Sequence, residues 1–125
     1  AQSIHKDFYG EWDFNLDWKP IKGFPVYFKW VVAITKAQKK LQESNISVPI
    51  LIIHSSDSIK ISNFSKEAMS KDIVLNIEDI KRVGLELGDK VSLIKIDNAQ
   101  HDVFLSTKIV REDAFDKMFS WLSTN

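Results

Sequence analysis

Two short apolar segments, each followed by polar residues, limit the fold more than any other feature of the sequence. Residues 48–53 have the sequence VPILII, and residues 91–96 have the sequence VSLIKI. Both are too short for a stable helix, and the unbroken apolar character of the first is typical of a strand covered on both faces. Because a predicted helix separates them, the two segments form a β-α-β unit with parallel strands and a right-handed crossover.

Three amphipathic helices are predicted around these strands. The first spans about residues 25–41, with a proline in its first turn and apolar residues at steps of three and four. The second spans residues 77–87, with Asn76 as its N-cap and Gly88 as its stop. The third spans about residues 109–122. The order of elements predicts an α/β fold with a single core.

The N-terminal part of the chain has a different character. Nine of the 14 aromatic residues lie within the first 30 residues, interleaved with glycine and proline. This pattern favours neither a helix nor a strand. We therefore expect residues 1–24 to form an irregular segment that lies against an apolar surface, because exposing so many rings to water is unfavourable. Residues 25–125 then form the core.

Composition excludes several classes of function. Lys and Arg number 17, as do Asp and Glu, so the net charge is zero and does not favour binding to nucleic acid or an anionic membrane. No apolar run approaches the roughly 20 residues that span a bilayer, and the first residues lack the apolar stretch of a signal peptide. The absence of cysteine excludes disulfides and thiol nucleophiles, which fits a cytoplasmic location.

Polar loops follow both predicted strands and contain the candidate catalytic residues. Asp57 lies in the first loop and His101 in the second. Ligands bind beyond the carboxyl ends of the strands in open parallel sheets, where these two loops would meet. An aspartate that accepts the Nδ1 hydrogen of a histidine leaves Nε2 free to act as a base. The alternative for Asp57 is a turn former or a helix cap.

The other histidines have structural interpretations. His54, at the end of an apolar strand, is expected to be a hydrogen-bonded structural residue, and His5 is expected to be solvated. A metal site built from His54, Asp57, His101 and Asp102 is conceivable. No short ligand spacing supports such a site, so neither a metal nor a cofactor is expected.

Two segments resemble the α/β-hydrolases. Residues 48–58, VPILIIHSSDS, resemble the penultimate strand and acid loop of that family, and residues 96–106, IDNAQHDVFLS, resemble its last strand and histidine loop. The nearest branch is the serine aminopeptidase and monoacylglycerol-lipase-like group, of lysophospholipase type. Residues 1–24 then resemble the tail of its lid region. The resemblance implies that the chain is the C-terminal β-α-β-α portion of a hydrolase, with Asp57 as the triad acid and His101 as the general base.

The nucleophile of that family is missing from the sequence. Its serine lies in a G-x-S-x-G motif on a strand-to-helix turn, and none of the four glycines here forms this motif. Ser55, Ser56 and Ser58 lie beside Asp57 but not on such a turn. The resemblance therefore implies a fragment of a serine hydrolase of ester or related acyl bonds, inactive alone, whose nucleophile lies outside this chain. The alternative is a non-catalytic binding or assembly module.

Two parallel strands also leave two open edges. Unpaired edges and exposed rings promote association with other chains. We therefore expect the chain either to require a missing N-terminal half or to associate with itself.

Overall fold

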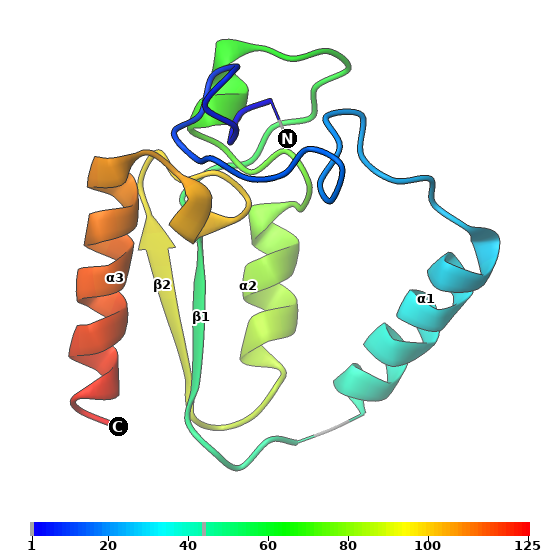
Figure 1. Cartoon of the computed structure of the whole chain (residues 1–125). Coiled ribbons are helices and arrows are strands. Elements are labelled where there is room, and N and C mark those ends of the chain that lie inside the picture. Colours follow the sequence, from blue (N-terminus) through cyan, green and yellow to red (C-terminus); the bar gives the residue numbers. More distant parts are fainter. Residues whose placement is uncertain (1, 44) are drawn as a thin grey trace.

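A computed structural model describes residues 2–43 and 45–125 of the chain. It is a mixed α/β structure with a two-stranded parallel sheet and three α-helices (Figure 1). In chain order the elements are α1 (Phe28–Gln42), β1 (Ile50–Ser55), the 3-10 helix η1 (Lys66–Met69), α2 (Ile77–Leu85), β2 (Val91–Ile96), the 3-10 helix η2 (Val103–Leu105) and α3 (Lys108–Leu122).

The sheet confirms the predicted parallel pairing. Ile50 lies opposite Val91 at one end of the register, and Ser55 lies opposite Ile96 at the other. Both strands therefore end at the same edge of the sheet, as parallel pairing requires. The loops that follow β1 and β2, together with the N-terminal segment, gather beyond this edge (Figure 1).

Alternating side chains of the strands pack against two helices. A Cβ atom added to Gly84 of α2 would meet the side chains of Ile52 and Leu93, so α2 packs closely on that face. Ile53 and Ile94 pack instead against the buried cluster that contains Ala114 of α3. Successive residues of a strand point to opposite faces, so α2 and α3 cover opposite faces of the sheet. Helix α2 connects β1 to β2 across one face, and α3, which follows β2, packs on the other.

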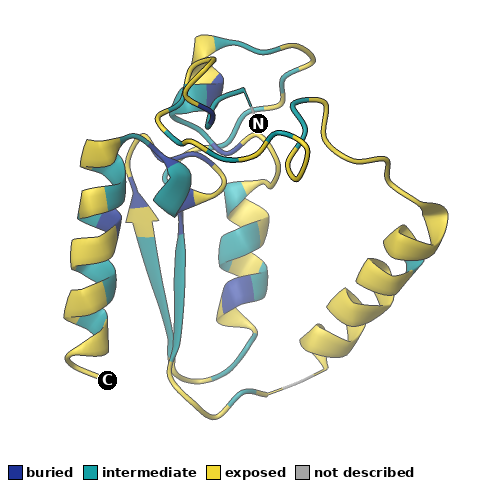
Figure 2. Cartoon of the chain, in the orientation of Figure 1, coloured by how far each residue is buried: buried dark blue, intermediate teal, exposed yellow. Residues whose placement is uncertain are grey.

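The hydrophobic core is small and lies near the carboxyl edge of the sheet. It consists of Ile96, Ala99, Val103 and Ala114, all less than 5% exposed. Most residues of the two strands are only partly buried, as Figure 2 shows. The prediction that the first strand is covered on both faces is therefore met only in part. Helices α2 and α3 lie on the two faces of the sheet, and no further described strand pairs with the outer side of β1 or β2.

Helix α2 begins where the sequence predicts. The side chain of Asn76 accepts a hydrogen bond from the backbone N–H of Glu78, which is the expected N-cap interaction. The helix ends at Leu85, two residues before the predicted end. Helix α3 begins at Lys108, one residue before the predicted start.

Helix α1 differs from its prediction in both position and packing. It begins at Phe28, because Tyr27 has an extended backbone with φ −89° and ψ 142°, and so Pro25 lies before the helix rather than in its first turn. None of its described residues is buried, and it stands apart from the sheet (Figures 1 and 2). Its apolar face is therefore largely exposed, with Ile34 and Leu41 each 38% exposed.

The N-terminal segment is irregular, as predicted, and its first half is the more buried of the two. Residues 2–14 fold back on themselves through an isolated bridge between His5 and Trp12. Further along, Trp18 is 81% exposed and Phe24 is 67% exposed, so the expected apolar support is absent there within the described chain.

No described helix is long and apolar enough to cross a membrane.

Candidate active site

A histidine and a buried aspartate form a hydrogen bond beyond the carboxyl edge of the sheet. The Nδ1 atom of His101 lies 2.8 Å from Oδ2 of Asp72. The side chain of Asp72 is 2% exposed, whereas that of His101 is 41% exposed. A carboxylate has no hydrogen to donate, so Nδ1 carries the proton of this bond. In the neutral imidazole, Nε2 is then the unprotonated nitrogen.

The carboxylate of Asp72 is held by further donors. Its Oδ1 atom accepts hydrogen bonds from the backbone N–H groups of Val74, at 2.8 Å, and Leu75, at 2.9 Å. The backbone of Asp72 is fixed as well, because its N–H donates to the carbonyl of Asp57 and its carbonyl accepts from the N–H of Ile59. Both carboxylate oxygens therefore have partners, and the side chain keeps one orientation toward His101.

Asp57, the acid expected from the sequence, forms no hydrogen bond or ion pair with His101 in the described structure. Its Oδ2 atom lies 2.7 Å from Nζ of Lys71, and its Oδ1 atom accepts a hydrogen bond from the N–H of Ser58. The hydrogen bond with Lys71 lowers the pKa of Asp57 and raises that of Lys71. Asp57 is 53% exposed. The prediction that Asp57 bonds to His101 is therefore wrong. Asp57 forms a surface ion pair with Lys71, and Asp72 lies beside the imidazole instead.

Asp72 escaped the sequence analysis because it lies 17 positions beyond the end of β1, in an irregular stretch. The loop after β1 turns back, and the bridge between Ser58 and Asp72 returns the chain to the sheet edge. One local signal was present. An aspartate that directly precedes an apolar run and a helix N-cap is a candidate for hydrogen bonds to the next backbone N–H groups.

Hydrogen bonds from Ser55 of β1 and from Ser106 hold the loop that contains His101 (the base loop, residues 97–102). The hydroxyl of Ser55 lies 2.7 Å from the carbonyl oxygen of Ala99 and donates toward it. The hydroxyl of Ser106 accepts a hydrogen bond from the N–H of Gln100 at 2.9 Å. Asn98 supplies the turn, with a left-handed φ of 59°, a conformation that asparagine adopts more readily than most residues.

The serines near Asp57 have structural contacts. Ser55 is fully buried and bonded to the base loop, and the hydroxyl of Ser58 accepts a hydrogen bond from the N–H of Ile77. Neither of them, nor Ser56, hydrogen-bonds to His101 in the described structure. The geometry gives none of the three the contact with a base that activates a serine.

The two other histidines are both buried. His54 is 4% exposed, and its Nδ1 lies 2.6 Å from the carbonyl oxygen of Ser55, which agrees with a structural role. His5 is 3% exposed, so the expectation that it is solvated is wrong. Its Nε2 bonds to the carbonyl of Phe14, and its Nδ1 accepts from the N–H of Asp7. Within residues 2–43 and 45–125, no three potential metal ligands of the His, Cys, Asp and Glu types come together.

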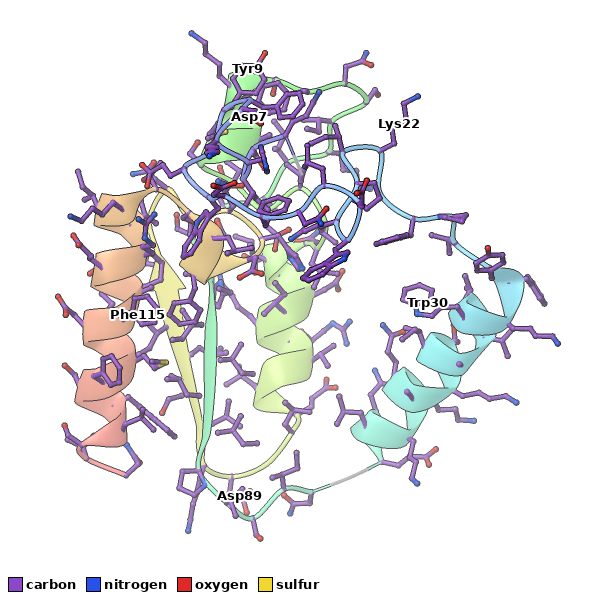
Figure 3. The ribbon with its side chains drawn as sticks, in the orientation of Figure 1. Asp7, Tyr9, Lys22, Trp30, Asp89 and Phe115 are labelled. Atoms are coloured by element: carbon purple, nitrogen blue, oxygen red, sulfur yellow. The ribbon has the colours of Figure 1, made fainter. Side chains whose placement is uncertain are left out.

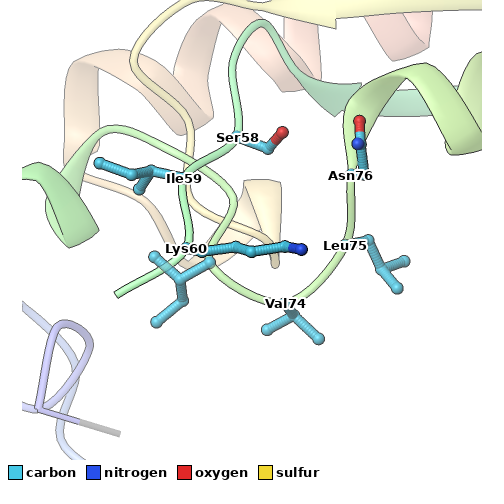
Figure 4. A pocket seen from close by; sticks show the side chains of 7 residues that line it. Ser58, Ile59, Lys60, Val74, Leu75 and Asn76 are labelled. Atoms are coloured by element: carbon cyan, nitrogen blue, oxygen red, sulfur yellow. The ribbon is translucent and has the colours of Figure 1, made fainter. Parts of the chain in front are cut away.

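A small pocket lies beside the segment that follows Asp72 (Figure 4). Its volume is about 180 Å³, and its walls come from residues 58–60 and 73–76. Neither Asp72 nor His101 lines it. This pocket is therefore not part of the immediate surroundings of the pair.

The sequence matches no protein-family model, and no curated protein or solved structure matches the chain.

Proposed function

We propose that this chain supplies the acid and the base of a serine hydrolase that acts on ester or related acyl bonds. His101 is the general base, and Asp72 is the acid that orients it. The observation that carries the proposal is the 2.8 Å hydrogen bond between Nδ1 of His101 and the buried carboxylate of Asp72. The resemblance of residues 96–106 to a hydrolase histidine loop supports it.

The geometry suits the proton transfers of acyl chemistry. A serine hydroxyl placed near Nε2 would give its proton to that nitrogen as its oxygen attacks the acyl carbon. His101 would then return the proton to the leaving group, while Asp72 stays ionised and stabilises the imidazolium. The side chain of His101 is 41% exposed, and no described residue forms a hydrogen bond with its Nε2 atom.

The nucleophile of this proposal lies outside the 125 residues. None of Gly10, Gly23, Gly84 and Gly88 belongs to a G-x-S-x-G motif. The exposed face of α1 and the unpaired edge of β1 are consistent with a further part of the protein that packs there and contributes the serine. The substrate is then a small ester or acyl compound, and the exposed rings of residues 18–30 would border its apolar pocket.

The test begins with the coding sequence upstream of Ala1, which should encode a G-x-S-x-G motif after an apolar strand. The full-length protein should hydrolyse a nitrophenyl ester, and its serine should react with a fluorophosphonate probe. Asp72→Asn should lower kcat by about 10³-fold to 10⁴-fold, as the loss of the triad acid does elsewhere. Asp57→Asn is the matched control and should leave kcat nearly unchanged.

Two results would count against the enzyme. A full-length protein without the motif, or hydrolysis that survives His101→Ala, would remove the catalytic role of this pair. In the first case the non-catalytic binding module would be the better interpretation, because the exposed rings and the open sheet edges would remain to be explained. In the second case the protein would be a hydrolase that uses another base.

A further inference from the structure

We propose that Gln100 is a positioning residue for His101 and that the N-terminal loop, residues 2–14, is the element that holds it in place. The inference rests on the proposed function, because it assigns a role in orienting the base of that same site. It concerns the residue before the histidine and a segment almost 100 positions away in the sequence.

Gln100 ties the base loop to two parts of the molecule. Its backbone N–H donates to the hydroxyl of Ser106, and its side-chain Nε2 donates to the carbonyl of Ser3 at 3.1 Å. The residue is 5% exposed, so this amide is buried with its donor satisfied. A buried amide that lost this acceptor would be left with an unsatisfied donor, which favours keeping the loop where it is.

The carbonyl of Ser3 is itself held in place by a folded loop. The N–H of Lys6 donates to the carbonyl of Trp12, and the N–H of Trp12 donates to the carbonyl of Ile4. The buried ring of His5 adds a hydrogen bond to the carbonyl of Phe14. Figure 3 shows the loop, with Asp7 and Tyr9 labelled, beyond the carboxyl edge of the sheet. The ring of Tyr9 stacks on that of Phe64, with 4.2 Å between the ring centroids, so this loop also packs against the segment after β1.

The same N-terminal loop also contacts η2 and the start of α3, which follow the base loop. The indole N–H of Trp12 donates to the carbonyl of Leu105 at 3.1 Å. The carboxylate of Glu11 accepts from the backbone N–H of Lys108, at 3.0 Å, and from Nη1 of Arg111, at 2.7 Å. Glu11 thus caps α3 in place of Thr107, whose side chain forms no cap hydrogen bond.

The N-terminal loop therefore binds the chain both before and after His101. Gln100 is bonded to Ser3 immediately before the histidine, and Lys108 is bonded to Glu11 after it. Among the described residues, the side chain of His101 forms a hydrogen bond with Asp72 alone. Keeping the imidazole 2.8 Å from that carboxylate therefore depends on the backbone of the base loop, which the N-terminal loop restrains. Small displacements of a catalytic group can lower turnover by as much as about 10²-fold.

The test follows the imidazole by NMR in the intact 125-residue chain, so it requires no turnover. The ¹⁵N shifts of His101 should show the Nδ1–H tautomer, with a downfield Nδ1–H proton signal. Gln100→Met keeps a side chain of similar length and removes its donor, so it should weaken or abolish that signal while the chain stays folded. Gln38→Met, on the exposed side of α1, is the matched control and should leave the signal unchanged.

A second variant disturbs the loop without touching the base loop. A Cβ at Gly10 would collide with the backbone carbonyl group of Ile4, so Gly10→Ala should shift the N-terminal loop and weaken the same signal. In the full-length enzyme, Gln100→Met should lower kcat about tenfold or more with little change in KM.

The inference is overturned if either Gln100→Met or Gly10→Ala keeps the wild-type signals of the His101 ring. Should Gln100→Met fail to fold, Gly10→Ala alone decides. The failure of the proposed function would be seen differently, as hydrolysis by the full-length protein that persists after His101→Ala.

Discussion

His101 and Asp72 lie 29 residues apart in the sequence and 2.8 Å apart in space, with one side chain accessible and the other buried. The loop after β1 brings Asp72 back to the sheet edge, and β2 delivers His101 to that edge. The pair is therefore a product of the β-α-β topology and of a long returning loop, and its buried member is the more constrained of the two.

The buried position of Asp72 predicts a large effect on stability. Asp72→Ala would leave the N–H groups of Val74 and Leu75 and the imidazole of His101 without their acceptor. We expect a loss of about 3 kcal/mol in the free energy of unfolding, since several bonds to a charged group disappear together. Urea titration measures it, and Asp57→Ala is the control. Equal losses for the two variants would contradict the distinction between them.

The ion pair of Asp57 and Lys71 predicts a pH dependence of stability. The pair lowers the pKa of Asp57, so the folded state releases this proton more readily than the unfolded state does. The stabilisation is therefore present above the usual carboxyl pKa and is lost as the pH falls through the lowered value. Thermal unfolding should show a small difference between wild type and Asp57→Asn at pH 7 that disappears at strongly acidic pH. A difference that grew on acidification would refute the sign.

Glu11 predicts a coupling between the N-terminal loop and α3. Glu11→Ala removes the cap of the helix and the partner of Arg111, and it should destabilise the chain by about 1 kcal/mol. A double-mutant cycle with Arg111→Ala should show that the two effects are not additive. Strictly additive losses would mean that the pair adds nothing beyond the cap.

Two glycines should respond differently to alanine. A Cβ at Gly88 would collide with the backbone carbonyl oxygen of Ile46. Relieving this collision requires the backbone to shift, so Gly88→Ala should be clearly destabilising. A Cβ at Gly84 would lie 2.6 Å from Cδ1 of Ile52, the mobile end of a side chain. The helix-propensity gain of about 1 kcal/mol at Gly84 offsets part of that cost. Denaturant midpoints rank the two variants, and the reverse order would contradict this comparison.

The exposed apolar face of α1 predicts concentration-dependent association of the isolated chain. Val31 and Ile34 are 43% and 38% exposed on a helix without buried residues, and β1 has an unpaired edge. Sedimentation across a dilution series should show oligomers that dissociate on dilution, and Ile34→Lys should weaken them. A monomer at every concentration would show that the surface is tolerated in water.

Local patterns were sufficient for several elements. The second strand, the start of α2 at its Asn76 cap and the extent of α3 follow from residues close together in the sequence, and the first strand lies two residues later than its predicted range, 48–53. The parallel order of the strands was inferred from the helix predicted between them. His101 was also singled out in this way, because it lies in the polar loop that follows the second strand. Hydrophobic periodicity and capping act over a few residues, so the sequence alone determines them.

Other features depended on contacts between distant residues. Three features are of this kind: the bond of His101 to Asp72 rather than Asp57, the burial of His5, and the capping of α3 by Glu11. No local sequence pattern predicts these contacts. A polar side chain becomes buried where its hydrogen bonds are satisfied, and those partners are supplied by the folded chain. The tertiary structure therefore decided which aspartate meets the histidine, because only the returning loop brings two backbone N–H groups and an imidazole to one carboxylate.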